Sequence, residues 1–155
     1  MRRGSMRENI DEVDKEILRM LQEDGRTSFS RIAKKLNLSE ATIHLRVKRL
    51  KERGILKGFH ADVDPEKVGK KVLAFILVKI DAKKYPETLS KIAEFRDVYE
   101  VHDITGEYSA LLKVRVSNKD ELAKLLDEIG KLDGVMDTYT MYALRTIKEK
   151  KTVEL

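Results

Sequence analysis

The 155-residue chain contains no cysteine and no tryptophan. Without cysteine it can form neither a disulfide framework nor a thiolate metal site. Its longest apolar run, residues 72–78, is far shorter than a membrane span requires. The charged N-terminus, residues 1–5, is not followed by the apolar stretch of a signal peptide. These absences predict a soluble, cytoplasmic protein.

The positive charge of the chain is concentrated in one short stretch. The net charge of +5 comes from residues 1–63, which hold 15 Lys and Arg against 10 Asp and Glu, whereas residues 64–155 hold 17 of each. Within residues 26–57, ten basic side chains stand against only Glu40 and Glu52. A run of charge is often just a solvated face, but a basic patch on one half of a chain is what binding to a polyanion requires.

Hydrophobic periodicity in the first half predicts three helices and a hairpin. We expect helices over residues 10–22 and 28–35, a third from the N-cap Ser39 to about residue 53, and a hairpin or wing over 55–63. The second and third predicted helices, joined by a tight turn, make a helix-turn-helix. In this motif the later helix, here the third predicted one, lies in the major groove of DNA. We therefore predict a winged helix-turn-helix DNA-binding domain over residues 8–63.

The third predicted helix carries the candidate DNA-reading residues. Ile43, Val47 and Leu50 define its core face, so Leu45 points to the opposite side. Contact with a thymine methyl group would explain a leucine aimed at water. Basic side chains and the helix N-terminus suit phosphates, and we expect these contacts from Arg26, Ser39, Lys48, Arg49 and Lys57. We expect base readout from Thr42, His44 and Leu45, with Ala41 on the same face and Arg46 as a further candidate.

Beyond a predicted linker over residues 64–71, the second half follows a βαββαβ order. We expect strands near residues 72–80, 98–105, 109–116 and 134–144 and helices near 85–95 and 119–130. This is the order of a ferredoxin-like α+β domain, which we place over residues 72–147. The first strand is apolar on both alternating faces, and the helices of such a fold cover only one face of the sheet. We predict that a second copy of the chain covers the other face; the alternative is the N-terminal domain.

Short motifs occur along nearly the whole chain, from about residue 10 to residue 144. In the first half they are Asp14-x-x-Ile17, Gly25-Arg26-x-Ser28, Ile32-Ala33-x-x-Leu36-x-Leu38-Ser39, Thr42-x-x-x-Arg46 and Leu50-x-x-x-Gly54-Ile55. In the second half, Thr105-Gly106-Glu107-Tyr108 stands between two predicted strands. Together and in this order, the motifs resemble those of the leucine-responsive regulator (Lrp/AsnC, or feast/famine) family of transcription regulators.

The resemblance implies a regulator that binds double-stranded DNA near promoters, dimerises through its C-terminal sheets, and assembles into tetramers, octamers or larger rings. It also implies an effector, often an amino acid, held by a glycine-centred loop. Carried over, this effector site comprises Thr105, Gly106, Glu107, Tyr108 and Ser109, facing Thr138 and Thr140 on the last strand. Gly106 permits loop N–H groups to approach a carboxylate closely.

The chain departs from the family at Ser109, where an aspartate is usual. An acid would be a natural partner for the ammonium of an amino acid, and serine carries no charge. Three explanations stay open: Asp103, Glu107 or Asp137 replaces the aspartate, the ligand differs, or the site is idle.

Other functions fit the sequence less well. His44, His60 and His102 lie on different predicted elements without metal-ligand spacing, and the chain has no phosphate-binding glycine loop and no nucleophile elbow. We therefore predict no catalytic residue, metal or cofactor. An architectural protein that coats DNA with little sequence preference is an alternative. A sensing module without DNA binding is another, but it leaves the basic stretch unexplained. We expect a nucleoid-associated transcription regulator.

Overall fold

The computed structural model describes residues 10–155 and divides the chain into two compact units. The first unit extends to residue 62 and includes residues 150–155, and the second comprises residues 63–149. The N-terminus that we predicted not to be a signal peptide, and the predicted domain start at residue 8, lie outside the described residues. Within residues 10–155, no helix is both long enough and apolar enough to cross a membrane.

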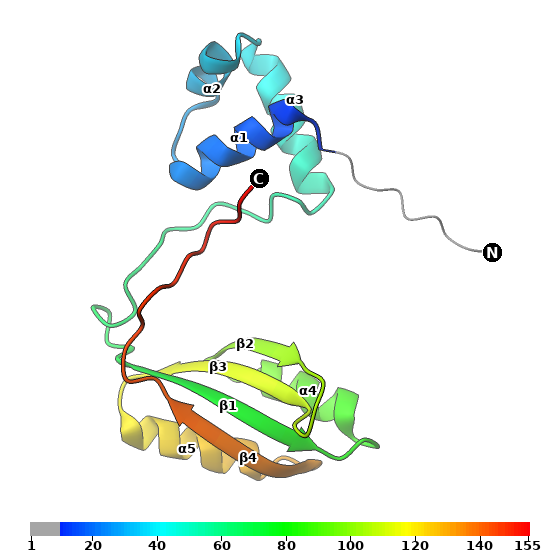
Figure 1. Cartoon of the computed structure of the whole chain (residues 1–155), viewed down its shortest axis with the longest axis vertical. Helices are drawn as coiled ribbons and strands as arrows, with labels where there is room; N and C mark the ends of the chain where they lie inside the picture. Colours follow the sequence, from blue (N-terminus) through cyan, green and yellow to red (C-terminus); the bar gives the residue numbers. More distant parts are fainter. Residues whose placement is uncertain (1–9) are drawn as a thin grey trace, which may run out of the picture. The chain divides into compact units, whose positions relative to one another are not determined.

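Three helices make the first unit, arranged as Figure 1 shows, and each begins at a side-chain N-cap. They are α1 (Glu12–Glu23), α2 (Phe29–Leu36) and α3 (Glu40–Glu52). Asp11, Ser28 and Ser39 each accept a hydrogen bond from the backbone N–H three residues further on, which satisfies a donor that has no partner within the helix. Asn37 adopts the left-handed conformation with a φ of 53°, so the chain turns sharply from α2 into α3. The predicted helix-turn-helix is confirmed.

The core of the first unit lies where the three helices meet. Ile17 of α1, Ile32 of α2 and Ile43 of α3 are fully buried, and Val47 packs in the same cluster. Each helix carries such side chains on one face, at spacings of three and four residues. The inner face of α3 is therefore fixed by the core, and its outer face meets the solvent.

The prediction of a hairpin or wing over residues 55–63 is wrong, because no strand forms there. The backbone N–H groups of Ile55 and Leu56 both donate to the carbonyl oxygen of Leu50, at 2.9 and 3.0 Å. They complete the end of α3 instead of pairing with another strand. Leu56 also packs against the helical core. The segment after α3 is thus an irregular connection that is anchored at its start.

Four antiparallel strands and two helices make the second unit (Figure 1). They are β1 (Val72–Ile80), α4 (Tyr85–Ala93), β2 (Val98–Asp103), β3 (Ala110–Val116), α5 (Lys119–Gly130) and β4 (Val135–Tyr142). The strand order is β2-β3-β1-β4, and both helices lie on the same side of the sheet. This is the predicted ferredoxin-like arrangement.

The central strand β1 has one covered face and one open face. Burial alternates along residues 72–80, because successive side chains of a strand point to opposite sides of the sheet. Ile76 is fully buried in the core beneath the helices, whereas Leu73, Phe75 and Leu77 on the other side stay half-exposed. Within the second unit alone, the second apolar face of β1 is not buried. We call this helix-free side of the sheet the open face.

Candidate nucleic-acid interface and effector loop

The outer face of α3 combines one exposed leucine with basic side chains. Leu45 is 49% exposed, and Ala41, Lys48 and Arg49 on the same side are exposed as well. Lys48 lies 3.8 Å from Glu52, a contact between solvated side chains that contributes little. The side chain of Arg49 has no hydrogen-bond or ion-pair partner among residues 10–155. This face therefore offers an apolar contact flanked by cations that can reach phosphates.

Arg46 is held by two carboxylates at the start of α1. Its Nη1 atom lies 2.7 Å from Oδ2 of Asp11 and 2.8 Å from Oδ1 of Asp14. A hydrogen bond from the backbone N–H of Asp14, together with the Arg46 guanidinium, lowers the pKa of Asp11. The hydrogen bonds to Asp11 and Asp14 in turn raise the pKa of Arg46. The contacts favour a positioning role for Arg46, which ties α3 to α1, over direct contact with a base.

Three other predicted DNA contacts are side chains already engaged within the protein. Ser39 Oγ accepts from the backbone N–H of Thr42 at 3.1 Å and lies 2.7 Å from its hydroxyl. The ring of His44 packs edge-on against Phe29, with 4.6 Å between ring centres, and its Nε2 lies 3.6 Å from Glu40. These contacts fix the start of α3 on α2. To contact DNA, each of these side chains would have to give up a contact that it makes within the protein.

Arg26 and Lys57 lie outside α3, one before α2 and one after α3. Both are exposed, and the structure gives neither side chain a partner within the part of the chain that it describes. The backbone N–H of Arg26 donates to Oδ1 of Asp24 at 2.9 Å, which fixes the loop that carries it. Both cations are therefore available to an external anion.

The predicted effector loop, residues 105–109, joins β2 to β3. Ser109 ties it to β1: its backbone N–H donates to the carbonyl oxygen of Val78 at 2.9 Å, and its hydroxyl accepts from the N–H of Ile80 at 3.1 Å. Gly106 has a φ of 126°, which residues with a side chain rarely adopt. Its own chain neighbours aside, no described atom lies within 4 Å of where its Cβ would stand. Ser109 thus secures the loop, while the backbone at Gly106 stays accessible.

Glu107 and Tyr108 extend from this loop toward β1 and β4. The rings of Tyr108 and Tyr139 have centres 6.4 Å apart, and Nζ of Lys79 lies 3.8 Å from Glu107. Partial desolvation and the carboxylates of Asp137 and Glu107 raise the pKa of Tyr108. The loop therefore contributes to a cluster of aromatic and charged groups at one end of the open face.

Within one chain, Thr138 and Thr140 do not face this loop. Along β4 they stand opposite Val78 and Ile76 of β1, whose side chains are fully buried on the helix-covered side. Directly opposed residues of an antiparallel pair point to the same side of the sheet. Tyr139, which lies between the two threonines, points to the open face and is the neighbour of the loop.

The three acids considered as replacements for the missing aspartate have separate partners. The carboxylate of Asp103, which accepts a hydrogen bond from the Tyr85 hydroxyl, raises the pKa of Tyr85 to about 12. Glu107 stands near Lys79, and Asp137 accepts from the backbone N–H of Thr138 at 2.9 Å. In the described part of the chain, no group of three or more His, Asp and Glu side chains could hold a metal ion.

Two family models match the chain in the order of its two units. Residues 10–51 match the AsnC-type helix-turn-helix domain, and residues 73–153 match the Lrp/AsnC ligand binding domain. The chain belongs to the Lrp/AsnC family. The resemblance that its motifs indicated is confirmed, and the protein is a helix-turn-helix transcriptional regulator.

This Lrp/AsnC regulator is similar over more than nine-tenths of its length to archaeal and bacterial proteins. The HTH-type transcriptional regulator FL11 of Pyrococcus horikoshii is 45% identical over 150 residues, which cover 97% of this chain and 98% of FL11. The structure of AsnC from E. coli has a TM-score of 0.87 at 34% identity and covers 93% of this chain and 98% of its own. A Neisseria meningitidis transcriptional regulator, solved as a complex with L-Met, has a TM-score of 0.86 at 26% identity, with coverages of 94% and 97%.

The partners of Arg46 are the contacts of this Lrp/AsnC regulator that sequence reasoning missed. Asp11 and Asp14 form a capping box at the start of α1, and two acids at this spacing before an apolar helix are a recognisable signal. Their contact with Arg46 spans 35 and 32 residues. No local pattern predicts it, because only the packing of α1 on α3 brings the groups together.

Proposed function

We propose that this regulator binds double-stranded DNA sequence-specifically through the outer face of α3, and that a small effector tunes this binding. The observation that carries the proposal is the exposed Leu45 beside Lys48 and Arg49 on an otherwise well-anchored helix. Leucine on such a face gains by contact with a thymine methyl group. Lys48 and Arg49, with Arg26 and Lys57 nearby in the sequence, bind phosphates and release counterions.

Fluorescence anisotropy with the DNA upstream of the protein's own gene tests this proposal. We expect Arg49→Ala to weaken binding about tenfold and to reduce the slope of log K against log salt by about 0.9. Arg96→Ala is the matched control, because Arg96 is an exposed arginine of the second unit. Equal effects of the two substitutions would exclude the outer face of α3 as the DNA-binding surface.

For the effector, we propose a small molecule of the amino-acid class at the loop of residues 105–109. Two observations support this: the accessible backbone at Gly106, and the relative from Neisseria meningitidis that was solved with L-Met. Oriented backbone N–H groups can hold a carboxylate, while Tyr108 and Tyr139 offer an apolar wall. Ser109 supplies no charge for an ammonium, and its side chain is bonded to β1.

The same anisotropy measurement, repeated with pooled amino acids and with scrambled DNA, tests the effector. We expect a preference for the upstream DNA and a change of its affinity with the pool. If the protein binds both DNAs with equal affinity and the pooled amino acids do not change that affinity, the result would favour the alternative of an architectural protein that coats DNA.

We also propose that the regulator self-associates through the open face of its sheet. Leu73, Phe75 and Leu77 of β1 stand there in a row, and Met141 of β4 is opposite Phe75. When a second copy covers an apolar row on a sheet face, apolar surface is removed from water, and this stabilises the assembly. From the family resemblance we further propose that two copies form a dimer in this way and that the dimers assemble into larger oligomers.

A further inference from the structure

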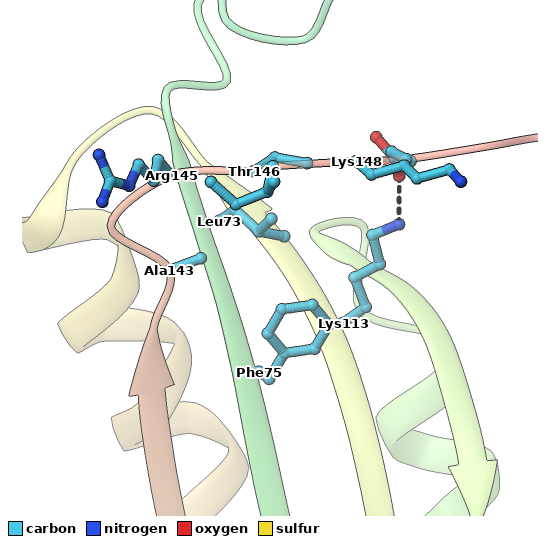
Figure 2. A pocket seen from close by; sticks show the side chains of 9 residues that line it. Leu73, Phe75, Lys113, Ala143, Arg145, Thr146 and Lys148 are labelled. Carbon is cyan, nitrogen blue, oxygen red and sulfur yellow. Dashed lines mark hydrogen bonds and ion pairs between the residues drawn. The ribbon is translucent and has the colours of Figure 1, made fainter.

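The chain that follows β4 crosses the open face of the second unit. The backbone N–H of Ala143 donates to the carbonyl oxygen of Leu73 at 2.9 Å, which continues the pairing of β4 with β1 by one residue. Beyond it, the chain leaves this edge of the sheet and passes over Leu73 and Phe75 toward β3 (Figure 2). We call residues 144–149 the strap. The strap and the strands beneath it all belong to the second unit, residues 63–149.

Ion pairs hold the far end of the strap on the sheet. Oε1 of Glu149 lies 2.6 Å from Nζ of Lys113, and its Oε2 lies 3.4 Å from Nη2 of Arg115. The hydrogen bond to Glu149 raises the pKa of Lys113. The side chains of Lys113 and Arg115 are largely buried, and an ion pair that is shielded from water is stronger than a solvated one. The strap is thus held at both ends, by β4 and by β3.

A hollow of about 440 Å³ lies between the strap and the sheet. Leu73, Phe75 and Ala143 line it from the sheet, Ile147 lines it from the strap, and the remaining lining residues are polar or charged. The apolar side chains of the strap do not fill it, because Leu144 and Ile147 are 92% and 83% exposed. One surface of the second unit therefore carries both an apolar hollow and apolar side chains that its own chain does not cover.

We propose that the strap is part of the assembly surface, and that the hollow receives the Ile147 side chain of a second copy. Copies related by a two-fold axis present the same surface to one another, so each surface must supply both a protruding group and a space that accepts it. Because Ile147 stands at the edge of its own hollow, a two-fold axis that passes beside it brings it to the hollow of the other copy.

Packing gives a second reason for this exchange. The core of a stable interface is packed as densely as a protein interior, so a hollow within the assembly surface has to be filled when two copies meet. Its apolar floor, with polar and charged residues around it, matches the apolar core and polar rim of such an interface. This inference rests on the proposed self-association through the open face, and it names the segment that completes the interface.

A strap that only shielded the sheet from other molecules would be built differently. Its apolar side chains would pack onto Leu73 and Phe75, and little space would remain beneath it. In this protein the apolar side chains of the strap are exposed, and its hold on the sheet is ionic, through Glu149. The ion pairs keep the strap in place, while its apolar groups stay available to a second copy.

Analytical ultracentrifugation of the full chain over a range of protein concentrations tests the strap. We expect Ile147→Ser to weaken self-association about tenfold, because it removes an apolar group that fills a pocket of the interface. Glu149→Gln should weaken it about threefold, because the strap loses its charged hold on Lys113 and is less well ordered for binding. Val68→Ser is the matched control, because Val68 is exposed but lies before β1 and outside the strap, and it should leave self-association unchanged.

Leu77→Glu, at the end of the β1 row that does not line the hollow, separates this inference from the proposal on which it rests. If Leu77→Glu dissociates the protein while Ile147→Ser behaves like Val68→Ser, the open face assembles without the strap, and the inference is wrong. If Ile147→Ser or Glu149→Gln strengthens self-association, the strap shields the face instead, and the inference is wrong as well. If the unsubstituted protein and all variants are monomers at every concentration, the proposal of self-association fails together with the inference.

Discussion

Arg46 and Arg49 lie on neighbouring turns of α3 and have different surroundings. The side chain of Arg46 is 28% exposed and contacts Asp11 and Asp14, whereas Arg49 is exposed and its side chain has no partner among the described residues. Sequence analysis assigned both to DNA, Arg49 to a phosphate and Arg46 as a candidate for base readout, because basic residues on a recognition helix are typical DNA contacts. The contacts of Arg46 indicate that it stabilises the protein. Arg49, by contrast, is available to bind DNA.

Arg46→Ala should therefore lower the free energy of unfolding by about 1.5 kcal/mol at neutral pH. The reason is that two charge-assisted hydrogen bonds between α1 and α3 are lost. Arg49→Ala should leave the free energy of unfolding nearly unchanged, because exposed substitutions away from such contacts have small effects. Urea denaturation of the two variants and the unsubstituted protein makes the comparison.

The pH dependence of this difference identifies the partners of Arg46. The pKa of Asp11 is lowered in the folded protein, so its contribution to stability is present above the ordinary value of 3.8 and is lost as the pH falls through the folded value. The difference between Arg46→Ala and the unsubstituted protein should shrink over that acidic range. A difference that stays constant down to pH 3 would contradict the role of Asp11.

At the level of the elements, local signals predicted most of the architecture. The N-caps Ser28 and Ser39 and the helical spacing of apolar residues located α2 and α3 closely, and the short continuous apolar run that begins at residue 72 located β1. The wing was mispredicted because the N–H groups of Ile55 and Leu56 bond to the end of α3, which a strand pattern does not reveal. The hydrogen bonds from Arg19 and Gln22 of α1 to the backbone of residues 150–155 were also unpredictable, since they join groups more than 130 residues apart.

Two glycines in loops of the second unit should differ in their tolerance of alanine. At Gly134, before β4, a Cβ would stand 2.5 Å from Oγ1 of Thr88 and 2.8 Å from Cβ of Lys84, with a φ of 97°. Gly106 also has a positive φ but no such neighbour. We expect Gly134→Ala to cost about 3 kcal/mol of folding free energy, from strain and overlap together, and Gly106→Ala about 1 kcal/mol from strain alone. Thermal unfolding of the two variants measures both costs, and equal costs would show that the overlap relaxes freely.

At the scale of the whole molecule, the two halves of the chain have different chemistry. The excess of basic residues lies in residues 1–63, and the remainder is neutral, in agreement with a DNA-binding unit followed by a unit for assembly and sensing. The sequence identified this division because charge distribution and motif order are properties of long stretches. It could not identify which sheet face is open, since β1 is apolar on both sides and only the position of α4 and α5 decides.

The open face allows a final prediction about assembly. Leu77 stands at the end of the β1 row opposite Tyr139 of β4 and is not among the residues that line the hollow beneath residues 145–149. Leu77→Glu would place an unpaired carboxylate in a covered interface, and we expect self-association to weaken about a hundredfold. Light scattering over a range of protein concentrations measures this change.

Val68→Glu is the matched control, because Val68 is 63% exposed and lies before β1, outside the sheet. The same change of side chain there should leave the oligomeric state unaltered. If both variants assemble as the unsubstituted protein does, the copies associate through another surface, and the half-exposed row of β1 is not the assembly interface. If only Leu77→Glu dissociates, the open face is the assembly surface.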